Sequence, residues 1–207
     1  MSQSIVINRE FGSGGREIGR QISQRTGAEF FDSRILQDAA AKRGLPANQL
    51  AAFDERLMAG QFLNLSITGF TDPEMTTLPY RMFSAIAEVI TQAAETRPAV
   101  FIGRCADVIL REAKLPVRSV FIYSTDQAAK IERAVQIDGV ARKEAEKHIA
   151  RMDRARSRYQ SFFTGTRFGD HREYDLCLNS ARLGFQGCAD AIIATLDEPA
   201  NGGTPGR

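Results

Sequence analysis

Residues 4–22 read SIVINREFGSGGREIGRQI, and this stretch determines the fold that we expect. The β-branched run at 4–8 predicts a buried strand, and Ile18 and Ile22, four residues apart, predict a helix after it. The segment GSGG at 12–15 lies between the two. A glycine loop between a strand and a helix gathers backbone N–H groups at the positive end of the helix dipole, so this segment predicts an anion-binding loop.

Strand and helix patterns alternate along the rest of the chain. Further strands are predicted at residues 28–32, 99–103, 117–123 and 174–179. Helices are predicted between them, including segments at about 80–96, 125–137 and 142–160. Five strands separated by helices predict an α/β fold, with a five-stranded parallel sheet and helices on both faces. Ligands of such sheets bind beyond the carboxyl ends of the strands.

The chain shows no linker between two cores, so we expect a single domain over residues 1–198. The segment 45–79 is less regular: its first part reads as a helix, and its second part, 64–79, reads as an exposed connection rich in turn residues. The tail at 199–207 is rich in proline and glycine and is expected to be disordered.

Composition and charge narrow the class of protein. The net charge is only +2 over 207 residues, which argues against a nucleic-acid-binding protein. The three cysteines are odd in number and lie in apolar patterns, which indicates free thiols in a reducing compartment. No leader and no apolar run of membrane-spanning length is visible, so we expect a cytoplasmic protein with no membrane partner. The sequence leaves open whether it is a monomer or a homodimer.

The glycine loop departs from the standard phosphate-binding pattern G-x-x-x-x-G-K-[ST]. If Gly14 is the second glycine of that pattern, the first glycine falls on Arg9, the lysine on Gly15 and the hydroxyl residue on Arg16. Three of the four defining positions therefore differ. One interpretation is a glycine-rich turn without a ligand.

The charges around the loop favour a bound anion. Arg9 and Arg16 flank the glycines, and Arg20 lies one helical turn beyond Arg16. Cations in the first turn of a helix oppose its dipole, and a bound anion would remove that conflict.

A second group of cations lies in the helix predicted at 142–160. Arg151, Arg154 and Arg158 follow helical spacing, and Arg156 is interleaved among them. A solvated helix face would explain such a charge run. Against that interpretation, acidic partners at i±4 are scarce in this segment, so repulsion between its cations is poorly offset within the helix.

Several segments together resemble a known family. INREFGSGGREIGRQISQRTGAEFFDSRIL resembles the opening of the cytidylate-kinase-like proteins, which are relatives of the P-loop nucleoside monophosphate kinases. FIGRCADVIL, VRSVFIY, RMDRARSRYQSFFTGTRFGD and YDLCLNS extend the resemblance in the expected order. It implies a P-loop NTPase-type three-layer sandwich with a helical, arginine-rich lid at about 140–172. The segment 45–79 would be an insertion on the acceptor side.

The resemblance also implies a donor site for ATP and Mg²⁺. The donor phosphates would be held by the residues of the loop and the first helical turn, namely Gly12, Ser13, Gly14, Gly15, Arg16 and Glu17. True cytidylate kinases keep the loop lysine, so we expect Arg16 to supply the missing cation. Together with Arg16, the resemblance gives the lid arginines Arg151, Arg154 and Arg158 a catalytic role. The metal ligands are not predicted.

On the acceptor side, the resemblance points to the ends of two strands. Asp32, Ser33 and Arg34 follow the second strand, and Arg104 and Asp107 follow the third. Asp32 or Ser33 could instead only cap the next helix, and Arg104 could be a surface charge. The implied function is transfer of the ATP γ-phosphoryl group to a nucleoside monophosphate, with CMP or dCMP as first candidates. The alternative is a catalytically weak nucleotide-binding or regulatory module with a degenerate loop.

Overall fold

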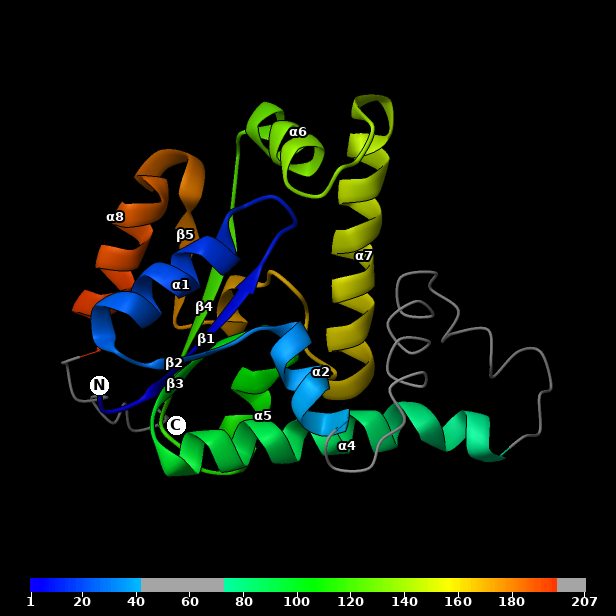
Figure 1. Ribbon diagram of the computed structural model, residues 1–207, viewed down its shortest axis with the longest axis vertical. Helices are drawn as coiled ribbons and strands as arrows, with labels where there is room; N and C mark the ends of the chain where they lie inside the picture. The colour runs from blue at the N-terminus through cyan, green and yellow to red at the C-terminus, as the bar shows by residue number, and fades with distance from the viewer. Residues whose placement is uncertain (42–72, 197–207) are drawn as a thin grey trace, which may run out of the picture.

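Five strands form one parallel sheet at the centre of the molecule, as the computed structural model shows for residues 1–41 and 73–196 (Figure 1). The strands are β1 (Ser4–Arg9), β2 (Glu29–Phe31), β3 (Ala99–Ile102), β4 (Val117–Tyr123) and β5 (Leu176–Asn179). Their order across the sheet is β2-β3-β1-β4-β5, and every neighbouring pair is parallel. The predicted five-stranded parallel sheet is confirmed.

The central strand β1 sends side chains alternately into two apolar layers. Ile5 and Ile7 are fully buried on one face, together with Ile18 and Ile22 of α1 (Gly15–Thr26). Val6 is buried on the opposite face. Strands buried on both faces carry continuous apolar runs rather than alternating patterns, which is why SIVI predicted a central strand.

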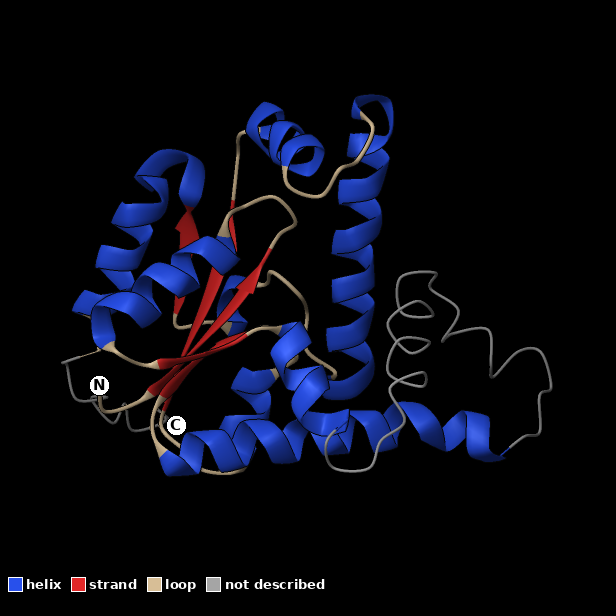
Figure 2. Ribbon diagram, viewed as in Figure 1, coloured by secondary structure: helices blue, strands red, loops and turns tan. Residues whose placement is uncertain are grey.

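Helices cover both faces of the sheet (Figure 2). One face carries α1 and α8 (Ser180–Ala194), whose buried residues pack with Ile5 and Ile7. The other face carries α2 (Ser33–Ala41), α4 (Pro73–Thr96) and α5 (Ala106–Glu112), which pack around Val6 and Phe101. The predicted three layers are therefore present.

Helices lie beyond the carboxyl ends of the strands (Figure 1), and we refer to the predicted lid at about 140–172 together with the helix before it as the lid segment. They are α6 (Gln127–Gln136), the short 3-10 helix η2 (Arg142–Glu144) and α7 (Ala145–Thr164), and a further 3-10 helix, η3 (His171–Glu173), precedes β5. The helices predicted at 125–137 and 142–160 match α6 and, shifted by a few residues, η2 with α7. None of the described helices is long and apolar enough to cross a membrane.

One predicted connection is helical. Residues 73–79 read as part of an exposed turn-rich segment, but α4 begins at Pro73 and contains Pro79. Proline suits the first position of a helix, where its missing N–H has no partner to lose, so Pro73 starts the helix that the turn residues before it conceal. The helix predicted in the first part of 45–79 and the tail at 199–207 lie outside the described residues.

Candidate functional site

The loop between β1 and α1 has the backbone that an anion site requires. Gly12 and Gly14 adopt positive φ angles of 77° and 83°, and Gly14 is the N-cap residue of α1. Gly14 has no side chain that could cap the helix, which leaves the first N–H groups of α1 to other partners. Ser13 Oγ donates a hydrogen bond of 2.9 Å to the Glu10 carbonyl oxygen, which stabilises the turn.

Glycine at position 15 has a steric explanation. A Cβ atom at Gly15 would lie 2.7 Å from Arg9 Cβ, a distance that side chains do not tolerate. The stem of Arg9 thus occupies the space where a loop lysine would begin. This contact could not be read from the sequence, since it depends on the path of the loop.

Arg16, which we expect to replace the lysine, contacts a carboxylate at the start of α2. Its Nε donates a hydrogen bond of 2.9 Å to Asp32 Oδ2, and its Nη2 contacts the same oxygen. Asp32 Oδ1 accepts hydrogen bonds from the amides of Arg34 and Ile35 at the start of α2. Asp32 is therefore both a helix cap and the anchor of Arg16.

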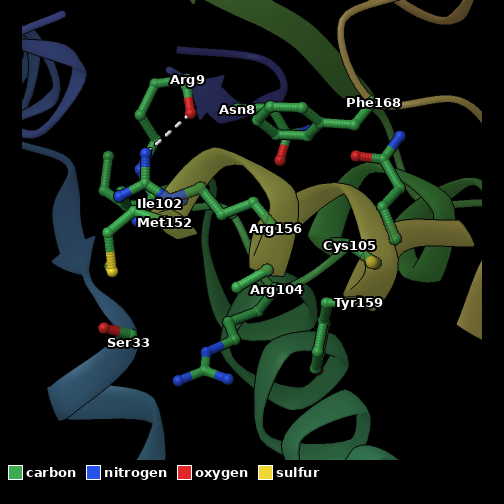
Figure 3. Close-up of a pocket in the computed structure, with 13 residues that line it drawn as sticks. Asn8, Arg9, Ser33, Ile102, Arg104, Cys105, Met152, Arg156, Tyr159 and Phe168 are labelled. Carbon is green, nitrogen blue, oxygen red and sulfur yellow. Dashed lines mark hydrogen bonds between the residues drawn. The ribbon is translucent and has the colours of Figure 1, made fainter. Parts of the chain in front are cut away.

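A pocket opens at the carboxyl ends of β1 and β3, beneath α7 (Figure 3). Its lining includes two of the predicted residues, Ser33 and Arg104. The lining also includes residues that the sequence did not single out as site residues, namely Asn8, Arg9, Arg156 and Tyr159. The side chain of Arg34 is exposed and is not part of this lining.

A left-handed turn places Arg104 in the pocket. Gly103, Arg104 and Cys105 have φ angles of 69°, 61° and 56° in succession. Left-handed conformations are unfavourable for residues with a Cβ atom and concentrate at functional sites. The Arg104 guanidinium lies over the Tyr159 ring, 5.5 Å from its centroid, so the strained turn directs this cation to α7.

The inward face of α7 contributes a different arginine from those predicted. Met152, Ala155, Arg156 and Tyr159 line the pocket at i, i+3, i+4, i+7 spacing. Arg151, Arg154 and Arg158 are exposed on the other faces of the helix. The apolar stripe that ends at Tyr159 marks the buried face and could have identified Arg156 from the sequence.

Positive charge is concentrated in the pocket. Burial, and after it the charges of Arg156 and Arg104, lower the pKa of Arg9 well below its ordinary value, whereas Asp32 raises it. Burial also lowers the pKa of Arg156, against the charge of Asp153. Guanidinium groups stay protonated in proteins, so these shifts express first the cost of burying charge and, at Arg9, also repulsion from neighbouring cations. A bound anion would offset that repulsion.

Two carboxylates tie the lid helices to the glycine loop. Asp153 Oδ1 of α7 accepts a hydrogen bond of 2.6 Å from the Phe11 amide. Glu10 Oε2 pairs with the buried Lys130 Nζ of α6 at 3.0 Å. The Arg156 Nη1 atom adds a hydrogen bond of 2.9 Å to the carbonyl oxygen of Arg9.

Glu17 and Asp107 are engaged within the protein. Arg133 of α6 contacts Glu17 Oε1 at 2.6 Å and also lies over the Phe185 ring. Asp107 is buried and accepts a hydrogen bond of 3.2 Å from Asn8 Nδ2. Burial raises the pKa of Asp107, although the Asn8 hydrogen bond and the charge of Arg111 oppose the shift. Asp107 therefore holds Asn8 of the pocket in place, and its role toward the acceptor stays a prediction.

The described residues do not form a dedicated metal site. Within 1–41 and 73–196, no group of three or more His, Cys, Asp or Glu side chains is arranged to hold an ion. Asp32, the carboxylate beside the loop, is already bound by Arg16 and by helix amides. Mg²⁺ is often held mainly by substrate phosphates, so no step below depends on protein ligands for it.

The family can now be stated. The sequence profile of the cytidylate kinase-like family matches residues 4–182, which covers the loop, the pocket and both lid helices. The chain belongs to this family. Membership supports a phosphotransferase that acts on a nucleotide and an acceptor, and the predicted resemblance is confirmed.

Solved structures share the fold at low sequence identity. An uncharacterized protein from Eubacterium ventriosum is 24% identical, with a TM-score of 0.70 over 95% of this chain and 99% of that chain. TT1252 from Thermus thermophilus is 18% identical, with a TM-score of 0.52 over 96% of this chain and 100% of that chain. Shikimate kinase from Bacteroides thetaiotaomicron is 13% identical, with a TM-score of 0.54 over 95% and 99% of the two chains. These likenesses confirm the P-loop NTPase-type α/β fold. Among curated proteins, no significant match is found.

Proposed function

We propose that this cytidylate kinase-like protein transfers the γ-phosphoryl group of ATP to a nucleoside monophosphate, with CMP or dCMP as the preferred acceptor. The observation that carries the proposal is the convergence of Arg9, Arg104 and Arg156 on one pocket, in which Arg9 also packs against Gly15 at the N-terminus of α1. A helix N-terminus can bind the phosphates of the donor, and a cluster of cations can bind the phosphate of the acceptor.

In this proposal the chain acts by positioning and charge, because phosphoryl transfer needs little covalent chemistry from the protein. The residues from Gly12 to Glu17 hold the donor phosphates on backbone N–H groups. Arg104 and Ser33 orient the acceptor phosphate at the end of β3. Arg16, held by Asp32, adds positive charge at the start of α1. Cytoplasmic location and the use of Mg·ATP remain parts of the proposal.

In this proposal the lid supplies positive charge to the site and excludes water from it. Arg156 reaches the pocket from α7, where it neutralises charge that spreads over the phosphoryl oxygens during transfer. The exposed arginines Arg151, Arg154 and Arg158 remain candidates for contact with the donor when α7 moves. Closure of α7 over the loop excludes water, which would otherwise accept the phosphoryl group.

A nucleotide-binding module without efficient catalysis is the second candidate. It is favoured by the glycine at position 15 and by the engagement of Arg16 with Asp32, which leaves the first turn of α1 without a lysine. A panel assay separates the two candidates. Purified protein receives Mg·ATP with each nucleoside monophosphate in turn, and ADP formation and thermal stability are measured in parallel.

We expect CMP or dCMP to give the highest kcat/KM of the panel. Arg104→Met should raise KM for the acceptor and lower kcat/KM by about 10²-fold, because a charge-assisted phosphate contact is lost. Absence of ADP above background with every acceptor, together with stabilisation by ATP, would identify a binding module instead.

A further inference from the structure

Arg9 occupies the position in space that a loop lysine would require. A Cβ atom at Gly15 would lie 2.7 Å from Arg9 Cβ and 3.0 Å from Arg9 Cγ. A lysine at position 15 therefore cannot coexist with this conformation of Arg9. The glycine at 15 and the arginine at 9 are two parts of one arrangement, in which a cation stands at the end of β1 instead of in the first turn of α1.

The other end of the Arg9 side chain meets a second glycine. A Cβ atom at Gly103 would lie 2.2 Å from Arg9 Nη1. The side chain thus runs from the phosphate-binding loop, at Gly15, to the acceptor side of the pocket, at Gly103. Both of its ends pass over residues without a side chain, so a Cβ atom at either glycine would collide with it.

Charged groups from both halves of the site act on the Arg9 guanidinium. Asp32 and Arg16 influence its pKa from the side of α1 and α2, and Arg104 and Arg156 influence it from the pocket. Arg16 is bound to Asp32, but no carboxylate in residues 1–41 and 73–196 lies within ion-pair distance of the Arg9 guanidinium. Cations held in a protein interior without such a partner are costly, which points to an anionic ligand.

We propose that Arg9 takes the place of the loop lysine and binds the phosphoryl group as it passes from donor to acceptor. The inference rests on the proposed phosphotransfer. In that step an acceptor phosphate oxygen forms a bond to the γ-phosphorus as the bond from this atom to the bridging oxygen breaks, and the electron pair leaves with ADP. Arg9 transfers no proton. Its N–H groups bind equatorial oxygens bidentately, which an ammonium group cannot do.

The first test removes the charge and keeps the stem. Arg9→Met retains an unbranched chain against Gly15, and we expect kcat to fall by about 10²-fold or more because transition-state charge loses its partner. Arg9→Lys should recover part of the rate. Arg25→Met is the matched control, since Arg25 lies at the far end of α1 in an exposed pair with Asp190, and it should leave kcat unchanged.

Stability distinguishes this role from a structural one. Because repulsion from Arg104 and Arg156 is relieved, Arg9→Met should have a melting temperature equal to or above that of the wild type in the absence of nucleotide. A large loss of stability together with a loss of rate in Arg9→Met would mean that Arg9 serves the fold, and the inference would be withdrawn.

A second test moves the cation back to its usual position. Gly15→Lys alone should lower the melting temperature because of the clash with Arg9. Arg9→Gly combined with Gly15→Lys removes the clash, so the double variant should regain the lost stability and exceed the kcat of Arg9→Gly at least about tenfold. If the effects of Arg9→Gly and Gly15→Lys on stability and on rate simply add, the two side chains do not compete for the same space, and the inference would be contradicted.

Binding of tripolyphosphate, measured by calorimetry without any acceptor, separates failure of this inference from failure of the proposed function. If the wild type transfers phosphoryl groups and Arg9→Met matches it in rate and in tripolyphosphate affinity, the inference on Arg9 is wrong while the function stands. If the wild type transfers nothing but binds tripolyphosphate, and Arg9→Met weakens that binding at least about tenfold, the function fails and Arg9 is still the phosphate-binding cation.

Discussion

Asp32 shows how one side chain can serve the fold and the site together. Its Oδ1 atom caps α2 through the amides of Arg34 and Ile35, and its Oδ2 atom holds Arg16 beside the glycine loop. From the sequence, a helix cap and a site residue were compatible interpretations of this position. In the structure the two carboxylate oxygens divide these tasks, so the start of α2 and the start of α1 are connected through a single residue.

The contribution of Asp32 to the free energy of unfolding should depend on pH. Burial alone would raise the pKa of Asp32, but hydrogen bonds from the Ile35 amide and from Arg16 outweigh it and lower the pKa below its ordinary value. The carboxylate therefore contributes stability above the unfolded pKa of about 4, and this contribution is lost as pH falls through the folded pKa. Asp32→Asn should be less stable than the wild type near neutral pH, and the difference should shrink below about pH 4 in denaturant titrations.

Asp190→Asn is the control for the loss of one carboxylate, because Asp190 forms an exposed ion pair with Arg25. Its free energy of unfolding should differ from that of the wild type by less than about 0.5 kcal/mol. A wild-type advantage over Asp32→Asn that stays constant down to pH 3 would show that the hydrogen-bonded carboxylate is not its source.

Helix α1 lies unusually close to the sheet because Gly19 faces it. A Cβ atom at Gly19 would lie 2.6 Å from Ile102 Cδ1, 3.2 Å from Phe30 Cε2 and 3.3 Å from Ile7 Cδ1. Glycine in a helix interior normally costs about 1 kcal/mol relative to alanine, so its presence here needs a packing reason. The close approach positions the first turn of α1, and with it the amides that we propose to bind phosphate, at the end of β1.

Two glycine-to-alanine substitutions in helices should therefore have opposite effects. Gly19→Ala should lower the free energy of unfolding by about 1–3 kcal/mol, because overpacking against Ile102 outweighs the gain in helix propensity. Gly187→Ala in α8 should raise it by about 0.5–1 kcal/mol, since Leu183 Cβ at 3.6 Å is an ordinary contact for the new methyl group. Chemical denaturation of both variants measures the effect, and a stabilised Gly19→Ala would refute the packing explanation.

Across the whole molecule, contacts between distant segments join the lid to the loop without a ligand. Phe11, Glu10 and Arg9 are bound respectively by Asp153, Lys130 and Arg156, which are more than a hundred residues away in the chain. These contacts bring α6 and α7 down over the carboxyl ends of β1 and β4 (Figure 1). Lid position and loop conformation should therefore change together.

Asp153→Ala tests this connection. It removes the acceptor of the Phe11 amide and one of the two carboxylates near the buried Lys130, at 3.8 Å. We expect a loss of about 1–3 kcal/mol in the free energy of unfolding and faster amide exchange in both residues 9–17 and α7. Lys147→Ala, an exposed substitution on α7, should leave exchange in the loop unchanged. Faster exchange confined to α7 in Asp153→Ala would show that lid and loop move independently.

Local sequence patterns were sufficient to predict the order and type of most of the helices and strands in the described residues. The apolar run at 4–8, the glycine loop and the helical spacing of Ile18 and Ile22 predicted β1, the loop and α1, because strand and helix periods depend on near neighbours. The start of α4 was missed, since turn residues before Pro73 and the internal Pro79 hide a helix that burial against the sheet stabilises.

The amino-acid sequence alone determined the parallel α/β fold, the glycine loop before α1 and the cationic character of the lid, since each depends on residue types at short, regular spacing. Only the tertiary structure decided which cations meet. Arg16 binds Asp32, Arg156 and not its neighbours enters the pocket, and Arg9 fills the space above Gly15. The physical reason is that charge acts through distance in space, and the strand order β2-β3-β1-β4-β5 brings together chain segments that the sequence separates.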